Sequence, residues 1–279
     1  MTDEEYQVLK REVLKLTDID LDSYKSQQMR RRLAFFIENT SGLEVASYCK
    51  KIEVDKDSLG KLRDHITINV TEFFRDDWAF TELEKNILPA LIRIKKTLRV
   101  WSVGCSNGAE AYSLAILLKI VTGSAEHKIL ATDIDELCLA KASAGGPYSR
   151  DSVKCVPEQH VKRYFTSSGD ALWVTPEIIN MVRFQRHNML SEPFEQGFDL
   201  ICCRNVTIYF TAEAKQKLNE QIHGSLNNSG VLFTGATEFM RDAEAIGFKK
   251  LGTCFYQKIA MPVSLDQIGE EPLLQTVRR

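Results

Sequence analysis

Residues 98–118 read Leu98-Arg-Val-Trp-Ser-Val-Gly104-Cys-Ser-Asn-Gly108-Ala-Glu110-Ala-Tyr-Ser-Leu-Ala-Ile-Leu-Leu118. The β-branched and aromatic run Val100–Val103 predicts a buried strand, and the apolar spacing after Glu110 predicts a helix. Between them, Gly104 and Gly108 can adopt conformations that other residues avoid, so a ligand can approach bare backbone there. A strand, a glycine loop and a helix N-terminus together predict the place where doubly wound α/β folds bind nucleotide-like cofactors.

The loop also indicates the class of cofactor. Its Gly-x-x-x-Gly spacing is neither the Gly-x-Gly-x-x-Gly of dinucleotide sites nor a phosphate loop that ends in Gly-Lys-Ser/Thr. No lysine stands where a triphosphate would need one, and Glu110 would repel phosphate at the helix start. We therefore expect a cofactor without phosphates, such as S-adenosylmethionine.

The composition is typical of an enzyme-sized globular chain. With 279 residues, 44% of them hydrophobic, it can build one large domain and a smaller one. The net charge of -2 gives no general case for a nucleic-acid partner. Residues 1–16 lack a signal-peptide core, and no apolar run reaches membrane-spanning length. Seven cysteines without paired short spacings and five scattered histidines favour a cytoplasmic protein without a metal site.

The pattern of secondary structure changes near residue 90. Before it, apolar residues recur at helical spacing, and we expect an all-helical N-terminal domain over residues 1–90. After residue 97, strands and helices alternate, which is typical of a parallel sheet covered by helices on both faces. The expected helices are Glu4–Leu16, Leu21–Ile37, Leu43–Ile52, Ser58–Ile66, Trp78–Ile94, Glu110–Thr122, Asp135–Ala144 and Ala212–Ser225, with Asp20, Asp22, Ser41 and Asp57 as N-caps, and the expected strands are Leu98–Val103, Lys128–Thr132, Val182–Arg186, Asp199–Cys203 and Gly230–Thr234.

Three segments depart from this alternation. Residues 145–181 contain Gly-Gly-Pro and Ser-Ser-Gly clusters, which predict a small insertion with short strands. Residues 248–258 have Gly252 near their middle and predict an antiparallel hairpin at one edge of the sheet. We expect the sheet domain over residues 91–260 and a loose tail over residues 261–279.

Polar residues follow the strands at the edge where the glycine loop lies. Asp133 and Asp135 end the second strand, where one carboxylate can accept hydrogen bonds from ribose hydroxyls and the other can cap the next helix. We favour Asp133 as the binding residue. Polar residues also follow the next two strands, in His187-Asn188-Met189 and Arg204-Asn205-Val206; the first of these, taken alone, is an ordinary turn.

The connection before the sheet, residues 66–76, places polar side chains between apolar ones without a clean period. Arg75 offers an always-charged fork that suits a carboxylate. The alternative for this segment is a set of helix caps and ion pairs.

Together these motifs resemble the CheR-type chemotaxis methyltransferases, which use S-adenosylmethionine to methylate glutamate side chains of bacterial chemoreceptors. The resemblance covers about residues 5–258. It implies an α/β fold, namely a Rossmann-like S-adenosylmethionine-dependent methyltransferase sheet with a small all-helical N-terminal domain and a small β-containing insertion. The motifs that carry it are Asn69-Val-Thr-Glu-Phe-Phe-Arg75, Ser106-Asn-Gly-Ala-Glu-Ala-Tyr-Ser113, Thr132-Asp-Ile-Asp135 and Cys203-Arg-Asn-Val-Thr-Ile-Tyr-Phe210.

The resemblance also implies roles for single residues. Arg75 and Tyr209 are the catalytic candidates, and Tyr209 lies where the family has a residue near the transferred methyl group. Gly104 belongs to the cofactor loop. The chain departs from the family in its single Glu110 between alanines and in Gly235-Ala-Thr-Glu238, where the family usually has Gly-His-Ser-Glu. By resemblance, Asn69, Thr71 and Arg75 contact the methionine end of the cofactor, Glu110 and Asp133 its polar groups, and Asn188, Met189, Asn205 and Val206 its adenosyl part.

The implied reaction, which leaves S-adenosylhomocysteine, needs little help from side chains. A glutamate carboxylate is already a nucleophile at neutral pH, because its reference pKa is about 4.3. Methyl transfer from a sulfonium is an in-line displacement, so alignment contributes most, up to ~7–11 kcal/mol in ideal cases. No general base is required, which agrees with the lack of a convincing catalytic histidine in the sequence.

The implied partner is the cytoplasmic helical domain of a methyl-accepting chemoreceptor. On the expected helix Leu21–Ile37, Arg30 and Arg32 flank an apolar face, and such a basic surface would attract a glutamate-rich helix. The alternative is that both arginines only solvate the helix. We expect a monomer without direct membrane insertion. The apolar face consists of Met29, Leu33, Phe36 and Ile37, with Lys25 also beside it.

Other functions stay open at this point. The basic stripe could bind RNA, as in a nucleic-acid methyltransferase, or the chain could methylate another substrate. A third alternative is a non-catalytic regulator that binds the cofactor without turnover. The presence of Asn69, Arg75, Asp133 and Asn205 argues against the regulator.

Overall fold

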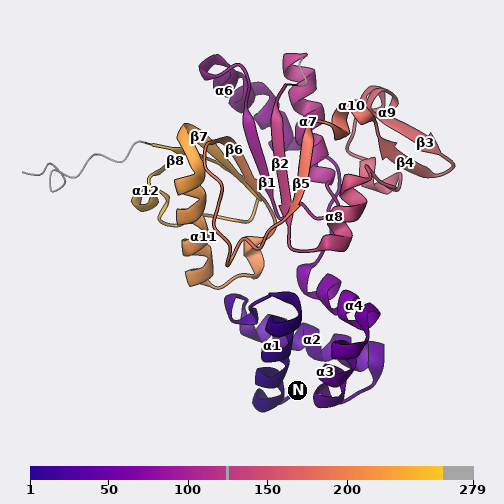
Figure 1. Cartoon of the computed structure of the whole chain (residues 1–279). Helices are drawn as coiled ribbons and strands as arrows, with labels where there is room; N and C mark the ends of the chain where they lie inside the picture. Colours follow the sequence, from indigo (N-terminus) through magenta and orange to yellow (C-terminus); the bar gives the residue numbers. More distant parts are fainter. Residues whose placement is uncertain (124–125, 260–279) are drawn as a thin grey trace, which may run out of the picture.

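The computed structural model describes residues 1–123 and 126–259, so the tail expected over residues 261–279 lies outside the described residues. The N-terminal part is helical, as expected, and forms the lower lobe in Figure 1. Within the described residues, no helix is long and apolar enough to cross a membrane. The N-terminal helices are α1 (Asp3–Thr17), α2 (Ser26–Ser41), α3 (Val45–Val54) and α4 (Lys56–Thr67), with a 3-10 turn, η1 (Leu21–Ser23), before α2.

The starts of these helices differ from the predictions in ways that local hydrogen bonds explain. Asp20 caps the 3-10 turn as expected, but α2 starts only at Ser26 and has no side-chain cap. Asp55, not Asp57, caps α4, because its carboxylate accepts hydrogen bonds from the backbone N–H groups of residues 57 and 58. The predicted caps at Asp22, Ser41 and Asp57 are therefore wrong.

The expected helix Trp78–Ile94 contains a π-helical turn. It consists of α5 (Asp77–Glu82), η2 (Leu83–Ile87) and α6 (Leu88–Ile94). Pro89 has no N–H to donate to the carbonyl four residues before it, and the wider turn directly precedes this position.

The sheet has seven strands in the order β5-β2-β1-β6-β7-β9-β8. Strands β5 to β7 in this order run parallel, whereas β9 is antiparallel to both β7 and β8, so the expected hairpin at the edge is confirmed. The direction of winding reverses between β1 and β6, where doubly wound folds bind ligands. The strands are β1 (Arg99–Val103), β2 (Lys128–Asp133), β5 (Val182–Arg186), β6 (Phe198–Cys203), β7 (Leu226–Thr234), β8 (Phe248–Lys250) and β9 (Phe255–Lys258).

Alternating side chains divide the core of the sheet into two hydrophobic clusters. Val100 and Leu200 point into the cluster under α5, α6 and α7 (Ala109–Thr122). Trp101 and Ile201 point into the other cluster, which contains α11 (Ala212–Ser225) and also the buried residues of α1 to α4. The helical lobe therefore shares a continuous core with one face of the sheet.

The remaining elements complete the fold. The insertion expected over residues 145–181 contains a two-stranded antiparallel sheet, drawn at the right of Figure 1. The predicted domain boundaries at residues 90 and 260 stay predictions. The remaining elements are α8 (Glu136–Ser143), η3 (Asp151–Val153), α9 (Glu158–Tyr164), β3 (Phe165–Ser168), β4 (Ala171–Val174), α10 (Pro176–Ile179), η4 (Thr207–Tyr209) and α12 (Ala243–Ile246).

Candidate functional site

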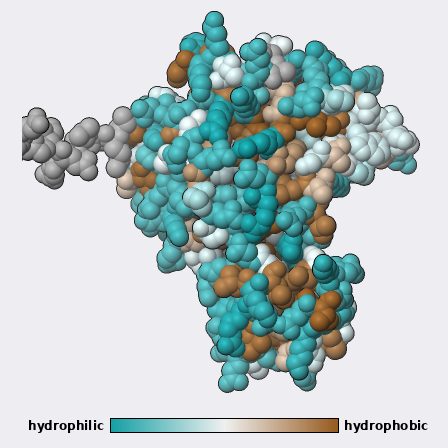
Figure 2. Space-filling model, viewed as in Figure 1, coloured by the Kyte–Doolittle hydropathy of each residue, from teal (hydrophilic) through white to brown (hydrophobic). Residues whose placement is uncertain are grey.

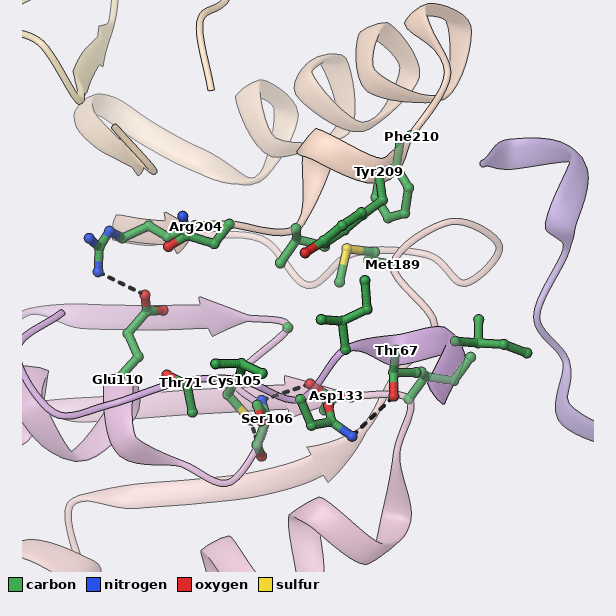
Figure 3. A pocket seen from close by; sticks show the side chains of 18 of the residues that line it. Thr67, Thr71, Cys105, Ser106, Glu110, Asp133, Met189, Arg204, Tyr209 and Phe210 are labelled. Carbon is green, nitrogen blue, oxygen red and sulfur yellow. Dashed lines mark hydrogen bonds and ion pairs between the residues drawn. The ribbon is translucent and has the colours of Figure 1, made fainter. Parts of the chain in front are cut away.

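A pocket with about 1020 Å³ of empty space, open solvent at its mouth included, lies at the carboxyl ends of β1, β2, β5 and β6. Residues of the helical lobe and of the linker after α4 complete its wall. In Figure 3, Arg204, Met189 and Tyr209 lie on one side of the pocket, opposite Glu110, Thr71 and Asp133. Every residue that the sequence assigned to cofactor or catalysis lines it: Asn69, Thr71, Arg75, Gly104, Glu110, Asp133, Asn188, Met189, Asn205, Val206 and Tyr209.

The glycine loop is fixed by backbone hydrogen bonds to β2. The N–H groups of Gly104 and Cys105 both donate to the carbonyl of Thr132, over 2.8 and 2.9 Å. Gly104 has φ +71°, and a Cβ there would lie 2.8 Å from the Val206 side chain and 3.2 Å from that of Met189. Only glycine therefore fits this position without narrowing the pocket.

Asp133 and Asp135 divide their tasks. Asp135 is fully buried and caps α8, since its carboxylate accepts from the N–H groups of Leu137 and Cys138. Asp133 lines the pocket and accepts 2.7 Å from the Ser106 N–H and 3.0 Å from the Asp135 N–H. Burial raises the pKa of Asp133, and these backbone hydrogen bonds oppose the rise. The carboxylate thus shapes the loop while it faces the pocket.

Glu110 and Arg204 form a buried pair across the pocket (Figure 3). Their nearest N–O distance is 3.5 Å, and Arg204 also donates over 2.8 Å to both the Asp76 carboxylate and the Arg75 carbonyl. Burial raises the pKa of Glu110, whereas Arg204 and the Ser102 hydroxyl lower it. The sequence predicts that Arg204 lies at the crevice, but it does not indicate a role for it. Its partners lie in segments that are distant in the sequence.

The linker after α4 is tied to the sheet by a side chain. The amide nitrogen of Asn69 donates 2.7 Å to the Asp135 carboxylate and 3.0 Å to the Thr67 hydroxyl. The Arg75 guanidinium donates 3.1 Å to the Val70 carbonyl. These contacts fold the linker over the pocket, which places its polar residues there.

Asn188 makes hydrogen bonds to two parts of the protein itself. Its amide nitrogen donates 2.6 Å to the carbonyl of Asp18, at the end of α1, and its oxygen accepts 3.0 Å from the Leu190 N–H. The side chain therefore fastens the helical lobe to the sheet. Its neighbour Met189 reaches the glycine loop.

Three buried polar atoms on residues that line the pocket have no hydrogen-bond partner within the part of the chain that the structure describes. They are Ser106 Oγ, His187 Nδ1 and Arg204 Nε. An unpaired buried polar atom costs about 1–3 kcal/mol, so a polar ligand would be favoured here. Carboxylates and guanidinium groups stand together in the lining, and lysine is missing from it. This donor set fits a zwitterionic, sulfonium-bearing cofactor better than a polyphosphate.

Arg30 and Arg32, the predicted docking residues, lie outside the pocket. The Arg30 guanidinium contacts the Met1 carbonyl and the Asp3 carboxylate. Arg32 donates to the His65 carbonyl. The apolar face beside them is mostly in the core, because Met29, Leu33 and Ile37 are buried.

Comparison with known proteins agrees with this geometry. The family model for the CheR methyltransferase all-alpha domain matches residues 4–67, and that for the CheR methyltransferase SAM binding domain matches residues 69–255. A chemotaxis protein methyltransferase of Listeria innocua is 37% identical over 257 residues, which cover 92% of this chain and 98% of that protein. Chemotaxis protein methyltransferase 1 of Pseudomonas aeruginosa is 34% identical over 239 residues, 82% of this chain and 87% of that protein.

Among solved structures, SAM-bound CalS10, an amino pentose methyltransferase from Micromonospora echinaspora, matches 58% of this chain and 52% of its own at 15% identity. Its TM-score of 0.34 is too low to add to the assignment. The family models alone cover most of the chain, in the order that its two parts have in the structure. The chain therefore belongs to the CheR methyltransferase family, and S-adenosylmethionine is its cofactor.

Proposed function

We propose that the chain transfers a methyl group from S-adenosylmethionine to glutamate side chains of bacterial chemoreceptors, forming methyl esters and S-adenosylhomocysteine. The names of its relatives support a chemotaxis substrate. The observation that carries a carboxylate acceptor is the apolar surroundings of Tyr209, where Met189, Val206 and Phe210 line the pocket. A carboxylate needs no general base to attack, whereas a hydroxyl or ammonium group does.

The bound cofactor supplies a methyl group on a positively charged sulfur. Attack by a carboxylate removes both charges, so a dry pocket favours the step. The protein's part is to hold donor and acceptor in line. For this we assign Asn69, Thr71, Arg75, Glu110 and Asp133 to the polar groups of the cofactor, Gly104 to close backbone approach, Asn188, Met189, Asn205 and Val206 to its adenosyl part, and Tyr209 to the transferred methyl group.

We further propose that a glutamate-rich receptor helix docks beside Arg30 and Arg32. Figure 2 shows apolar patches among polar residues on the helical lobe, so a receptor helix would meet both kinds of surface. The Arg30 side chain is partly exposed and can therefore contact a receptor helix. Its guanidinium also binds the Asp3 carboxylate and the Met1 carbonyl at the start of α1. We place the enzyme in the cytoplasm, as a monomer without a nucleic-acid partner or direct membrane insertion.

Incubation with radiolabelled S-adenosylmethionine and receptor-enriched membranes tests the proposal. We expect base-labile label on a membrane protein, because methyl esters hydrolyse in alkali. Membranes from cells without chemoreceptors are the control. Base-stable label, or label on added RNA, would point to another substrate, and cofactor binding without any transfer would point to a non-catalytic regulator.

A further inference from the structure

The segment after β6 carries five of the residues that line the pocket: Arg204, Asn205, Val206, Tyr209 and Phe210. It belongs to no strand or α-helix and forms only the short turn η4. Asn205 has φ +59°, a left-handed conformation that asparagine adopts more readily than most residues with a side chain. Because neither a strand ladder nor an α-helix fixes the segment, contacts from outside it hold it in place.

Glu238 supplies these contacts at the start of the segment. One oxygen of its carboxylate accepts from the N–H groups of Asn205 and Gly235, over 2.6 and 2.8 Å. The other accepts from the N–H and the hydroxyl of Thr207, over 2.7 and 2.9 Å. An ionised carboxylate accepts about four hydrogen bonds, so its capacity is filled.

The surroundings of Glu238 show that its negative charge is held by hydrogen-bond donors. The residue is 5% exposed, and among the ion pairs of the described residues none involves it. Gly235 permits the close approach, because a Cβ there would lie 2.5 Å from the Glu238 carboxylate and 3.0 Å from the Asn205 nitrogen. Glycine and glutamate at these two positions therefore form one unit.

Lys25 holds the other end of the segment from the helical lobe. Its backbone N–H donates 2.9 Å to the Tyr209 carbonyl, and its ammonium group donates 2.8 Å to the Ile208 carbonyl. The ring of Tyr24 packs edge-on against Phe210 with ring centroids 5.1 Å apart. Tyr209 thus lies between two anchors that are far apart in the sequence.

We propose that Glu238 is a positioning residue for methyl transfer, whose carboxylate holds the Asn205–Tyr209 segment in the conformation that the pocket needs. In the sequence, Glu238 stands out only as part of a departure from the family's usual motif. The expected effect on cofactor binding depends only on the family assignment. The expected effect on turnover rests on the proposed function.

The substitution Glu238→Gln separates this role from packing. Glutamine has the same shape, but its amide nitrogen donates hydrogen bonds and would face the N–H of Thr207 or the pair from Asn205 and Gly235. A residue that only fills space would tolerate the exchange. A carboxylate that orders three backbone N–H groups would not.

We expect Glu238→Gln to weaken S-adenosylhomocysteine binding, and to lower the turnover number at saturating receptor, each on the order of tenfold or more. Hydrogen exchange at residues 204–211 should speed up, while exchange in the central strands stays as in the unmodified chain. Glu213→Gln, on the exposed face of α11, is the matched control and should change none of these values. Titration calorimetry, methylation assays and mass spectrometry supply the measurements.

Thr207→Val keeps the Glu238 charge and removes only the hydroxyl donor. We therefore expect affinity, turnover number and exchange rate to change in the same direction, with the logarithm of each fold-change about a fifth to a half as large. This variant keeps the test decisive if Glu238→Gln does not fold. Normal binding and exchange in both folded variants, or in Thr207→Val when Glu238→Gln fails to fold, would overturn the inference. If the receptor were not the substrate, turnover would fail in the unmodified chain, whereas the binding and exchange effects of Glu238→Gln would remain.

Discussion

Two groups of residues in the pocket lining, called walls below, are held in different ways. The wall at the ends of β1 and β2 is fixed by backbone hydrogen bonds between adjacent strands, such as those from Gly104 and Cys105 to Thr132. The wall formed by the linker and the segment after β6 is fixed by side chains from elsewhere, with Asn69 bonded to Asp135, 66 residues away. The first wall depends on local sequence, whereas the second depends on polar contacts that only the complete fold creates.

The strand-end wall should show the largest effect when a side chain is added. Gly104→Ala places a methyl group against Val206 and Met189 in a left-handed backbone. We expect cofactor affinity to fall on the order of 100-fold, because a methyl group added to a well-packed site costs about 1–3 kcal/mol. Gly123→Ala is the matched control, since Gly123 also has positive φ but no atom of the described residues lies within 4 Å of its added Cβ. It should lose only about 1–2 kcal/mol of stability. Equal cofactor affinities in calorimetry would contradict the steric argument.

Asp133→Ala tests the same wall by removing a charge. The cofactor should lose about 1.5–3 kcal/mol of binding free energy, the value of a hydrogen bond to a charged group. Stability should fall too, because the N–H groups of Ser106 and Asp135 lose their acceptor. Calorimetry with S-adenosylhomocysteine gives the first quantity and thermal unfolding the second. Unchanged affinity in a folded variant would remove Asp133 from the cofactor site.

The wall formed by the linker and the segment after β6 should separate binding from chemistry. Arg75→Ala should weaken cofactor binding roughly tenfold, whereas Tyr209→Phe should keep affinity and lower turnover by about the same factor, the value of one hydrogen bond. Steady-state assays with receptor membranes, together with calorimetry, distinguish the two. A Tyr209→Phe enzyme with normal turnover would show that the hydroxyl plays no part near the methyl group.

The smallest expected effect concerns Asp64 of α4 and Asp135, the N-cap of α8, whose carboxyl groups interact. Burial and the neighbouring Asp135 raise the pKa of Asp64 to about 6. Because the pKa is higher in the folded than in the unfolded state, this group stabilises the fold at low pH, and that contribution is lost as pH rises through about 6. Asp64→Asn can donate to Asp135 at any pH, so it should flatten the dependence of the unfolding midpoint between pH 3.8 and about 6.

Asp170→Asn, at an exposed turn, serves as the control for this small change. It should leave the slope of the unfolding midpoint against pH as it is in the unmodified chain. Parallel curves for the Asp64 variant and the unmodified chain would show that the carboxyl pair does not couple to folding.

The contrast between the walls also explains what could be predicted from the sequence. The strand, the glycine loop and the helix at residues 98–118 lie next to one another in the chain, so periodicity and glycine spacing indicate them. Asp133 could be placed at the site for the same reason, because it is the last residue of β2. The family resemblance was confirmed by both family models and supplied the candidates on the other wall, and the structure brings all of them to one pocket.

The side-chain contacts that hold the site together could not be predicted, because they join residues that are far apart in the sequence. Arg204 meets Asp76 and Glu110 only after the linker folds back, and Glu238 meets Asn205 across a turn after β7. The predicted N-cap at Asp57 failed because two acidic residues stand close together and the spacing alone does not say which one caps. The positions of Arg30 and Arg32 outside the pocket likewise follow from packing of the lobe. Their docking role stays a prediction.

The bond from Lys25 to the Ile208 carbonyl spans 183 residues, and this has a consequence for how the protein is made. The ribosome adds about 5–20 residues per second, so the helical lobe waits roughly 10–40 s before its partner segment is synthesised. During that interval Tyr24 has no Phe210 to pack against. A nascent chain that has not yet reached residue 210 therefore has only part of the pocket, and the cofactor site is complete only after that segment has been synthesised.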